Sequence, residues 1–276
     1  MRLVFFGDVV GRSGRDGLAR HVPVLRDRFH PEVVIANVEN AARGFGVTLK
    51  IVRELTELGI HVFTTGNHVW DQRELVGTID SEPRLLRPLN YPEGTPGRGL
   101  YWHKLPDGRG LLVLNPLGRL FTGHLIDDPF AATEAVLARQ SLGTSGVNAI
   151  FVDFHAETTA EKMALANVLD GRVSAVVGTH THVPTADARI LPRGTAYLTD
   201  AGMCGDYDSV IGNQKDAAVW RFTRKIPGER LAPAEGEATV CGVFLETDDS
   251  TGLAKRITPF RCGGVMGEER AERTGG

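Results

Sequence analysis

Apolar runs of strand length recur along the chain, and several of them stop at a glycine or at a polar side chain. The runs are Leu3–Phe6, Val33–Asn37, Val62–Thr65, Ala149–Phe154 and Ala175–Thr179. Short runs of apolar and β-branched residues predict strands that are buried on both faces. Segments with the apolar spacing of amphipathic helices lie between them, so the first 80 residues predict parallel βαβ units.

The segments between the strands predict helices and one tight loop. Apolar residues at helical spacing predict helices over 18–29, 51–58, 130–140 and 158–169, with a short helix over 70–76. Thr158 and Glu161 form the pattern of a capping box at the start of the fourth helix. Residues 7–14 predict a glycine-rich loop, but without a Gly-Lys-Ser/Thr ending they do not favour a nucleotide-binding loop.

The second half of the chain predicts further strands, not all of them parallel. A turn at 106–110 lies between two apolar stretches and predicts a β-hairpin. Further strand-like runs lie at 188–191, 196–199, 218–222, 239–246 and 254–260. We therefore expect an α/β fold in which two mixed sheets pack together between outer helices. Residues 1–276 are expected to form a single domain, with a mobile tail at 267–276.

Composition and charge restrict the classes of function. The chain has 276 residues, 42% of them hydrophobic and 24% charged, and its net charge of −3 gives no extended surface for nucleic acid. No apolar run has the length of a membrane span, and no apolar leader follows Met1, so we expect a cytoplasmic protein without membrane contact. Cys204, Cys241 and Cys262 are widely spaced, which favours free thiols in a reducing compartment.

Potential metal ligands gather at the ends of the predicted strands. They are Asp8, Glu39, Asn40, Asn67, His155, His180 and His182, and His68 follows directly after Asn67. Each of these residues taken alone is more often structural, but ligand residues at strand ends that converge predict a site at the carboxyl edge of the sheet. His180 and His182 stand at alternate positions of an expected extended segment, which would turn both imidazoles to one face.

This donor set predicts two metal ions and a hydrolytic reaction. Imidazole and carboxylate ligands without thiolate favour iron or manganese, with zinc and magnesium as alternatives. Two cations that share a carboxylate can bind the oxygens of a phosphate and activate a bridging hydroxide for attack on phosphorus. The leaving alkoxide then needs a proton, and His68 is the predicted donor because an imidazole exchanges protons near neutral pH.

The ordered motifs resemble the calcineurin-like metallophosphoesterase superfamily, and more narrowly its YmdB-like branch of bacterial 2′,3′-cyclic-nucleotide or cyclic-AMP phosphodiesterases. The motifs are Gly7-Asp8, Glu39-Asn40, Gly66-Asn67-His68, His155 and Gly178–His182. The resemblance implies a four-layer α/β/β/α sandwich, a homo-oligomer and a small phosphoester substrate. It also implies one ion held by Asp8, Asn40 and His182, a second held by Asn67, His155 and His180, and Glu39 between them.

The chain differs from the wider superfamily at two positions, and other functions stay open. Val10 replaces the histidine of the usual Asp-x-His motif, and Glu39-Asn40 replaces the usual Gly-Asp pair. The alternatives are a regulatory protein that binds nucleotide or RNA ends with vestigial hydrolysis, and a phosphomonoesterase or protein phosphatase. Further candidates around the site are Asp153 and Glu157 as partners of ligand histidines, Arg12, Arg43 and Arg73 as phosphate contacts, and 206–209 as pocket lining.

Overall fold

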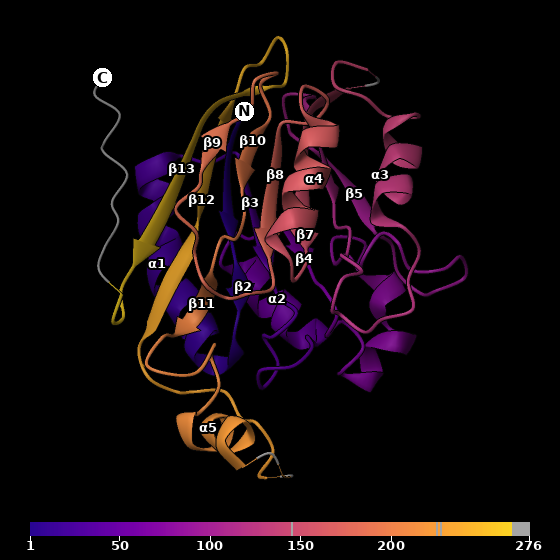
Figure 1. Cartoon of the computed structure of the whole chain (residues 1–276). Coiled ribbons are helices and arrows are strands. Elements are labelled where there is room, and N and C mark those ends of the chain that lie inside the picture. The colour runs from indigo at the N-terminus through magenta and orange to yellow at the C-terminus, as the bar shows by residue number, and fades with distance from the viewer. Residues whose placement is uncertain (145, 225, 227, 267–276) are drawn as a thin grey trace.

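Two mixed β-sheets form the centre of the molecule (Figure 1). The computed structural model describes residues 1–144, 146–224, 226 and 228–266. Within them, the first sheet has the order β2 (Asp8–Val9), β11 (Met203–Asp206), β12 (Ala238–Thr247), β1 (Arg2–Phe6), β3 (Val33–Asn37) and β4 (Val62–Thr64), and β13 (Ala254–Cys262) pairs with β12. The second sheet has the order β5 (Leu100–Lys104), β6 (Gly110–Leu114), β7 (Val147–His155), β8 (Ala175–Thr179), β10 (Ala196–Leu198) and β9 (Arg189–Ile190).

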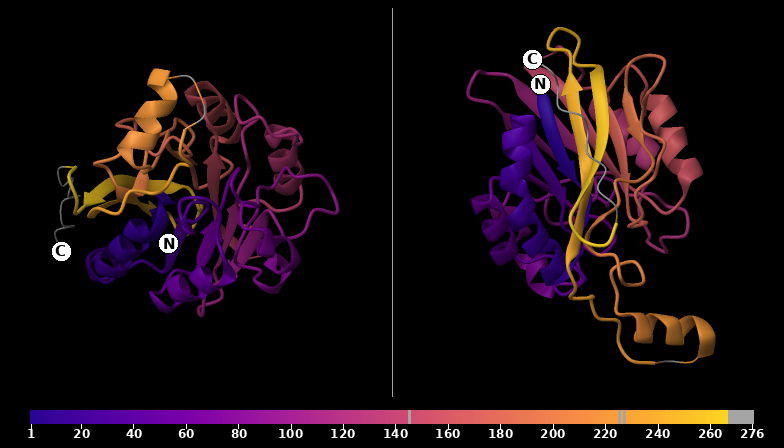
Figure 2. Two further views of the ribbon diagram at one scale, coloured as in Figure 1. Left: turned by 90° about the horizontal axis from the view of Figure 1, so that it is seen from below. Right: turned by 90° about the vertical axis from the view of Figure 1, so that its left-hand side faces the viewer.

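Helices cover the outer faces of both sheets, so the predicted four-layer α/β/β/α sandwich is confirmed (Figures 1 and 2). The first sheet packs against α1 (Gly11–Phe29) and α2 (Leu49–Glu57), and the second against α3 (Pro129–Leu137) and α4 (Thr159–Leu169). Two short 3₁₀ helices, η1 (Arg73–Gly77) and η2 (Ile79–Ser81), follow β4. The helix expected over 70–76 is therefore a turn followed by η1.

The alternation of side chains along each strand explains how a strand packs against the other sheet on one face and against helices on the other. Successive side chains of a strand point to opposite faces. In β1, Leu3 and Phe5 face the core between the sheets, whereas Val4 and Phe6 face the helices. Phe5 meets Phe151 of the other sheet with ring centroids 5.0 Å apart. The strands had to be apolar on both faces because both faces are buried.

The strands that carry the predicted ligands run in the same direction within each sheet. In the first sheet β1, β3 and β4 are parallel, and in the second β6, β7, β8 and β10 are parallel. The antiparallel hairpin of β5 and β6 is confirmed. Parallel strands end at the same edge of their sheet, so the residues that follow them come together there.

The strand predicted over 218–222 is wrong, because these residues belong to α5 (Lys215–Arg224). Val219 and Phe222 are β-prone but 48% and 80% exposed. Figures 1 and 2 show α5 projecting from the body, away from the edges of both sheets. A segment without a neighbouring strand satisfies its backbone hydrogen bonds within itself, which favours a helix.

The glycine-rich loop expected at residues 7–14 is also wrong in part, since α1 already begins at Gly11. A Cβ on Gly14 would collide with the carbonyl oxygen of Cys204 in β11. The glycine therefore permits close contact between helix and sheet rather than a loop. At α4, Thr158 caps the helix as predicted by accepting a bond from Glu161 N at 3.2 Å. The carboxylate of Glu161 instead accepts from Arg119 N at 2.9 Å, so the reciprocal half of the capping box is not formed.

Two expectations lie outside these observations. The tail at 267–276 is not among the described residues, and the assignment of 1–276 to one domain stays a prediction. Among the helices of the described residues, none combines the length and the apolar character that crossing a membrane requires.

Candidate metal centre

The predicted ligands follow strands of both sheets. Asp8 follows β1, Glu39 and Asn40 follow β3, Asn67 and His68 follow β4, His155 ends β7, and His180 and His182 follow β8. Glycine allows one of these segments to come close to the others: a Cβ on Gly66 would collide with the ring of His155 and the carboxylate of Glu39. The Gly-Asn-His turn is therefore a place of close approach between the two sheets.

Four potential ligand atoms meet at His155. Its Nε2 lies 3.0 Å from Glu39 Oε1, 3.0 Å from Asn67 Oδ1 and 3.0 Å from His180 Nδ1. One ring nitrogen carries at most one proton and cannot donate to three acceptors. Ligand atoms about 2.0–2.2 Å from a shared ion are themselves roughly 3 Å apart. Glu39, His155 and His180 form a possible metal-binding cluster, and this group of residues fits a metal ion.

The other three predicted ligands lie around this cluster without joining it. Asp8 Oδ1 and Asn40 Oδ1 are buried and have no hydrogen-bond partner. Asp8 Oδ2 accepts from His180 N at 3.1 Å, and Asn40 Nδ2 donates to Gly44 O at 3.0 Å, which leaves each Oδ1 free. His182 is held by its Nδ1, 2.8 Å from Ile211 O. These two buried Oδ1 atoms lack a hydrogen-bond donor, and a cation bound near them would supply the missing partner.

His180 and His182 do not lie on an extended segment, so the expectation that an extended segment turns both imidazoles to one face is wrong. Strand β8 ends at Thr179, and His180 and His182 have φ angles of 104° and 65°. Both residues stand in the left-handed region that non-glycine residues seldom adopt. Their side chains are therefore directed by a turn, not by the alternation of a strand.

Burial and close charges set the protonation of the centre. Burial alone would raise the pKa of Glu39, but the charge and hydrogen bond of His155 lower it to about 2. Burial lowers the pKa of His180 to about 3, assisted by the charge of His155. Burial raises the pKa of Asp8, against the opposing charges of His182 and His155. Glu39 is thus an ionised carboxylate and His180 a neutral imidazole, the forms that bind metals.

A buried relay sets the tautomer of His155. Thr179 Oγ1 donates to Asp153 Oδ1 at 2.7 Å, so it accepts from His155 Nδ1 at 2.9 Å. Burial alone would lower the pKa of His155, but the neighbouring carboxylates, Glu39 first, raise it to about 9, so without a cation Nε2 is protonated as well. A metal ion at Nε2 would displace that proton while Nδ1 keeps its own. Asp153 also accepts from Asn37 Nδ2 at 3.0 Å and from Thr64 Oγ1, and burial raises its pKa to about 6. Asp153 therefore contacts the ligand histidine through Thr179, whereas Glu157 Oε2 lies directly 2.9 Å from His180 Nε2.

His68 lies beside the centre with one ring nitrogen engaged. Its backbone N donates to Glu39 Oε2 at 3.0 Å, and its Nδ1 lies 2.8 Å from Asp71 Oδ2. The ring of Phe45 packs edge-on against the imidazole, with centroids 5.1 Å apart. The side chain of His68 is 29% exposed. The imidazole is thus oriented by Asp71 and Phe45 and open to solvent, as a proton donor requires.

The sequence as a whole matches one protein family. The model of the YmdB-like protein family aligns with residues 4–260. The chain belongs to the YmdB-like family. It is 48% identical over 257 residues to the 2′,3′-cyclic-nucleotide 2′-phosphodiesterase of Bacillus subtilis, covering 93% of this chain and 95% of the relative. Membership confirms the predicted relationship to the metallophosphoesterases, and this relative supports the predicted class of enzyme, a hydrolase of phosphodiesters.

Two solved structures are similar to this YmdB-like chain over nearly their whole length. A hypothetical protein from Thermus thermophilus is 41% identical with a TM-score of 0.87, covering 98% of this chain and 100% of that one. A structure described as a novel phosphatase from Mycoplasma pneumoniae is 32% identical with a TM-score of 0.88, covering 95% and 93%. The sandwich fold is therefore shared with two solved structures, one of which is described as a phosphatase.

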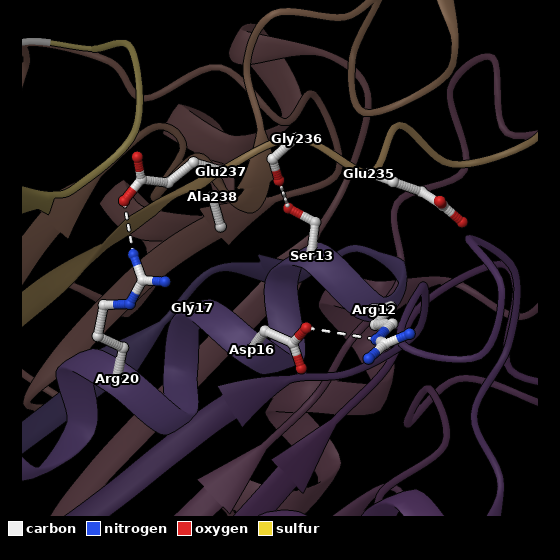
Figure 3. A pocket seen from close by; sticks show the side chains of 9 residues that line it. All are labelled: Arg12, Ser13, Asp16, Gly17, Arg20, Glu235, Gly236, Glu237 and Ala238. Carbon is white, nitrogen blue, oxygen red and sulfur yellow. Dashed lines mark hydrogen bonds and ion pairs between the residues drawn. The ribbon is translucent and has the colours of Figure 1, made fainter.

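The other candidates from the sequence lie on the periphery of the YmdB-like domain. Arg12 lines a groove of about 360 Å³ between α1 and residues 235–238, where its Nε lies 3.4 Å from Asp16 Oδ2 (Figure 3). Arg43 and Arg73 are exposed. Asp206 is buried, and its carboxylate accepts from the backbone N of Asp208 and of Gly236, both at 2.8 Å. Asp206 therefore has a structural role in holding its own loop.

Sequence reasoning missed one ion pair close to the centre. Lys162 and Asp200 are 1% and 0% exposed, with Lys162 Nζ 2.9 Å from Asp200 Oδ2. Lys162 stands on the same helical face as the buried residues Leu165, Ala166 and Leu169. A lysine in the apolar stripe of a helix was the signal that could have indicated a buried carboxylate partner.

Proposed function

We propose that this chain hydrolyses a small phosphodiester, a cyclic nucleotide being the favoured substrate, at a centre of two metal ions. The observation that carries the proposal is the meeting of Glu39, Asn67 and His180 at the Nε2 atom of His155. The name of the Bacillus subtilis relative, a 2′,3′-cyclic-nucleotide 2′-phosphodiesterase, supports a cyclic nucleotide as substrate.

The seven proposed ligands divide into one group for each ion and one carboxylate between them. Asn67, His155 and His180 would hold one ion, Asp8, Asn40 and His182 the other, and Glu39 would bridge the two. The unpartnered Oδ1 atoms of Asp8 and Asn40 support the second group. Iron or manganese is the proposed metal, with zinc and magnesium as alternatives. When bound, two such cations neutralise phosphate oxygens and make a water molecule more acidic.

The chain's own contribution to the chemistry is proton transfer and orientation. Nδ1 of His68 is engaged by Asp71, so the proton for the leaving oxygen has to come from Nε2. The contact with the carboxylate of Asp71 orients the imidazole for this donation. The Asp153–Thr179–His155 relay holds one proton on Nδ1 of His155, so Nε2 is the nitrogen that would give up its proton to bind the ion.

Metal analysis tests the centre directly. We expect elemental analysis of the protein purified without added metal to give about two transition-metal ions per chain. Removing them with a chelator should abolish hydrolysis and lower the melting temperature, because ions that bind only the folded state stabilise it. A folded protein that neither contains nor takes up metal would refute the proposal.

A comparison of substrates tests the proposed substrate class. We expect the catalytic efficiency on 2′,3′-cyclic or 3′,5′-cyclic nucleotides to exceed that on nucleoside monophosphates. A preference for monoesters would favour a phosphomonoesterase, an alternative that the phosphatase from Mycoplasma pneumoniae supports. A cytoplasmic location and a homo-oligomeric state, both expected from the sequence, stay predictions.

A further inference from the structure

A buried ion pair lies directly behind the turn that carries His180 and His182. Lys162 of α4 and Asp200, two residues after β10, meet at 2.9 Å and are 1% and 0% exposed. Burial of an ion pair usually contributes little net stability, because desolvation offsets most of the attraction. The other contacts of Asp200 therefore indicate its role besides neutralising Lys162.

Asp200 holds the residue between the two histidines. Its Oδ2 accepts from the backbone N of Thr181 at 3.0 Å and from Thr181 Oγ1 at 2.8 Å, in addition to Lys162 Nζ. Its Oδ1 accepts from Gly202 N at 2.9 Å. Both donors of Thr181 thus bind one carboxylate oxygen, and Lys162 is the ion-pair partner of this buried carboxylate.

The turn that Asp200 holds has an unfavourable backbone. His180 and His182 have φ angles of 104° and 65°. A non-glycine residue seldom adopts the left-handed region, and such a conformation persists only where the surroundings impose it. Other contacts act at the ends of the turn: His180 N donates to Asp8 Oδ2 at 3.1 Å, and Tyr207 OH donates to His182 O at 2.9 Å. Asp200 acts at its middle.

Without Asp200 the turn would relax toward ordinary φ values, and both imidazoles would change direction. His180 Nδ1 now lies 3.0 Å from His155 Nε2, and a peptide rotation at Thr181 would separate these atoms. The contact of Asp200 is with Thr181 and not with a ligand atom. The charge of Asp200 also acts on Asp8, so Thr181→Val, which leaves that charge in place, isolates the effect of the shape of the turn.

We propose that Asp200, with Lys162 as its counter-charge, is the positioning residue of the metal-binding turn, and sets the affinity of the protein for its ions. This inference rests on the metal centre of the proposed function.

The test compares three variants in apo protein titrated with Mn²⁺ alone. Thr181→Val removes the hydroxyl donor and keeps the backbone donor, and Asp200→Asn replaces one acceptor oxygen by a donor. We expect both to weaken Mn²⁺ binding about ten- to a hundredfold, as substitutions behind metal ligands do. The rise in melting temperature on adding Mn²⁺ should shrink in parallel, and Thr181→Ser, which keeps both donors, should restore wild-type binding.

Asp170→Asn is the matched control. Asp170 follows the same helix, is 5% exposed and accepts from Arg193 N at 2.9 Å and from Thr195 N at 3.3 Å, both outside the turn at 180–182. We expect it to lower the melting temperature of the apo protein and to leave the affinity for Mn²⁺ unchanged.

The outcomes separate the two proposals. Variants at Thr181 and Asp200 that melt earlier but bind Mn²⁺ like the wild type would overturn the positioning role and leave only a structural one. If Asp200→Asn does not fold, the pair of Thr181→Val and Thr181→Ser decides the question alone. A wild-type protein that binds no Mn²⁺, Fe²⁺ or Zn²⁺ would instead refute the proposed metal centre itself.

Discussion

The Nε2 atom of His155 lies 3.0 Å from the Nδ1 atom of His180. Both nitrogens carry lone pairs unless one is protonated, and two lone pairs at this distance repel each other. The Nδ1 proton of His155 points away, toward Thr179. The carboxylates of Glu39 and Asp8 raise the pKa of His155 to about 9 against its burial, so a proton on Nε2 joins the pair until a cation displaces it. One proton serves only one acceptor, and the three acceptor atoms that lie 3.0 Å from Nε2 therefore favour a cation.

Gly66→Ala should disable the centre while leaving the fold. A Cβ at residue 66 would overlap the ring of His155 and the carboxylate of Glu39, so one of them has to move out of the centre. We expect the variant to retain its secondary structure by circular dichroism but to lose at least tenfold in metal affinity, measured by calorimetry.

Gly77→Ala is the matched control for this substitution. Gly77 ends η1, and a Cβ there would have no atom within 4 Å. Its metal affinity should equal that of the wild type. If Gly66→Ala also binds metal normally, the close approach of the Gly-Asn-His turn to His155 is not required for the centre.

Thr179→Val should weaken metal binding through the tautomer of His155. The substitution removes the hydroxyl that accepts from His155 Nδ1 and donates to Asp153. The imidazole is then free to carry its proton on Nε2, the nitrogen that faces Glu39 and Asn67. We expect a ten- to hundredfold loss of metal affinity, and recovery in Thr179→Ser. Equal affinities of the three proteins would show that the relay does not control His155.

The fold was predictable because burial leaves a simple pattern. Strands β1, β3 and β8 are buried on both faces, so their sequences are the continuous apolar runs expected of strands that lie between two layers. The helix α5 was not predictable in the same way. Its residues Val219, Trp220 and Phe222 are apolar without being part of the core, and a short apolar run does not distinguish a strand from a helix.

The meeting of several strand-end residues was predictable, whereas their roles as ligands stay a prediction and the geometry around them was only partly predictable. The strand-end motifs were sufficient to indicate Asn67, His155 and His180, since parallel strands end together. The turn at His180–His182 depends on Asp200, which lies 19 residues after Thr181 in the sequence. Tertiary hydrogen bonds of this kind impose backbone angles that no local preference of histidine suggests.

His68→Asn should affect the rate of hydrolysis and not the metal content. The side chain of His68 makes its bond to Asp71, and its link to Glu39 runs through the backbone N, which the substitution preserves. We expect kcat to fall about 10²–10⁴-fold on a substrate with a poor leaving group, with unchanged metal stoichiometry. His124→Asn, at a histidine bonded to Thr122 O, should be silent in both measurements. Loss of metal in His68→Asn would make His68 a ligand instead.

Protonation of His61 should make the folded protein less stable in mild acid. Burial lowers the pKa of His61 to about 4, assisted by His103, and its unprotonated Nδ1 accepts from Val34 N at 2.9 Å. A group whose pKa is lower in the folded state stabilises the fold above its unfolded pKa of about 6.5 and loses that contribution as the pH falls toward 4. Because His61 is partly exposed, we expect a loss of about 1–3 kcal/mol in the free energy of unfolding between pH 7 and pH 4.5. Urea unfolding of His61→Asn over the same range should show a smaller loss, since the amide oxygen can accept from Val34 N without titrating. An identical decline in the two proteins would assign the acid sensitivity to other groups.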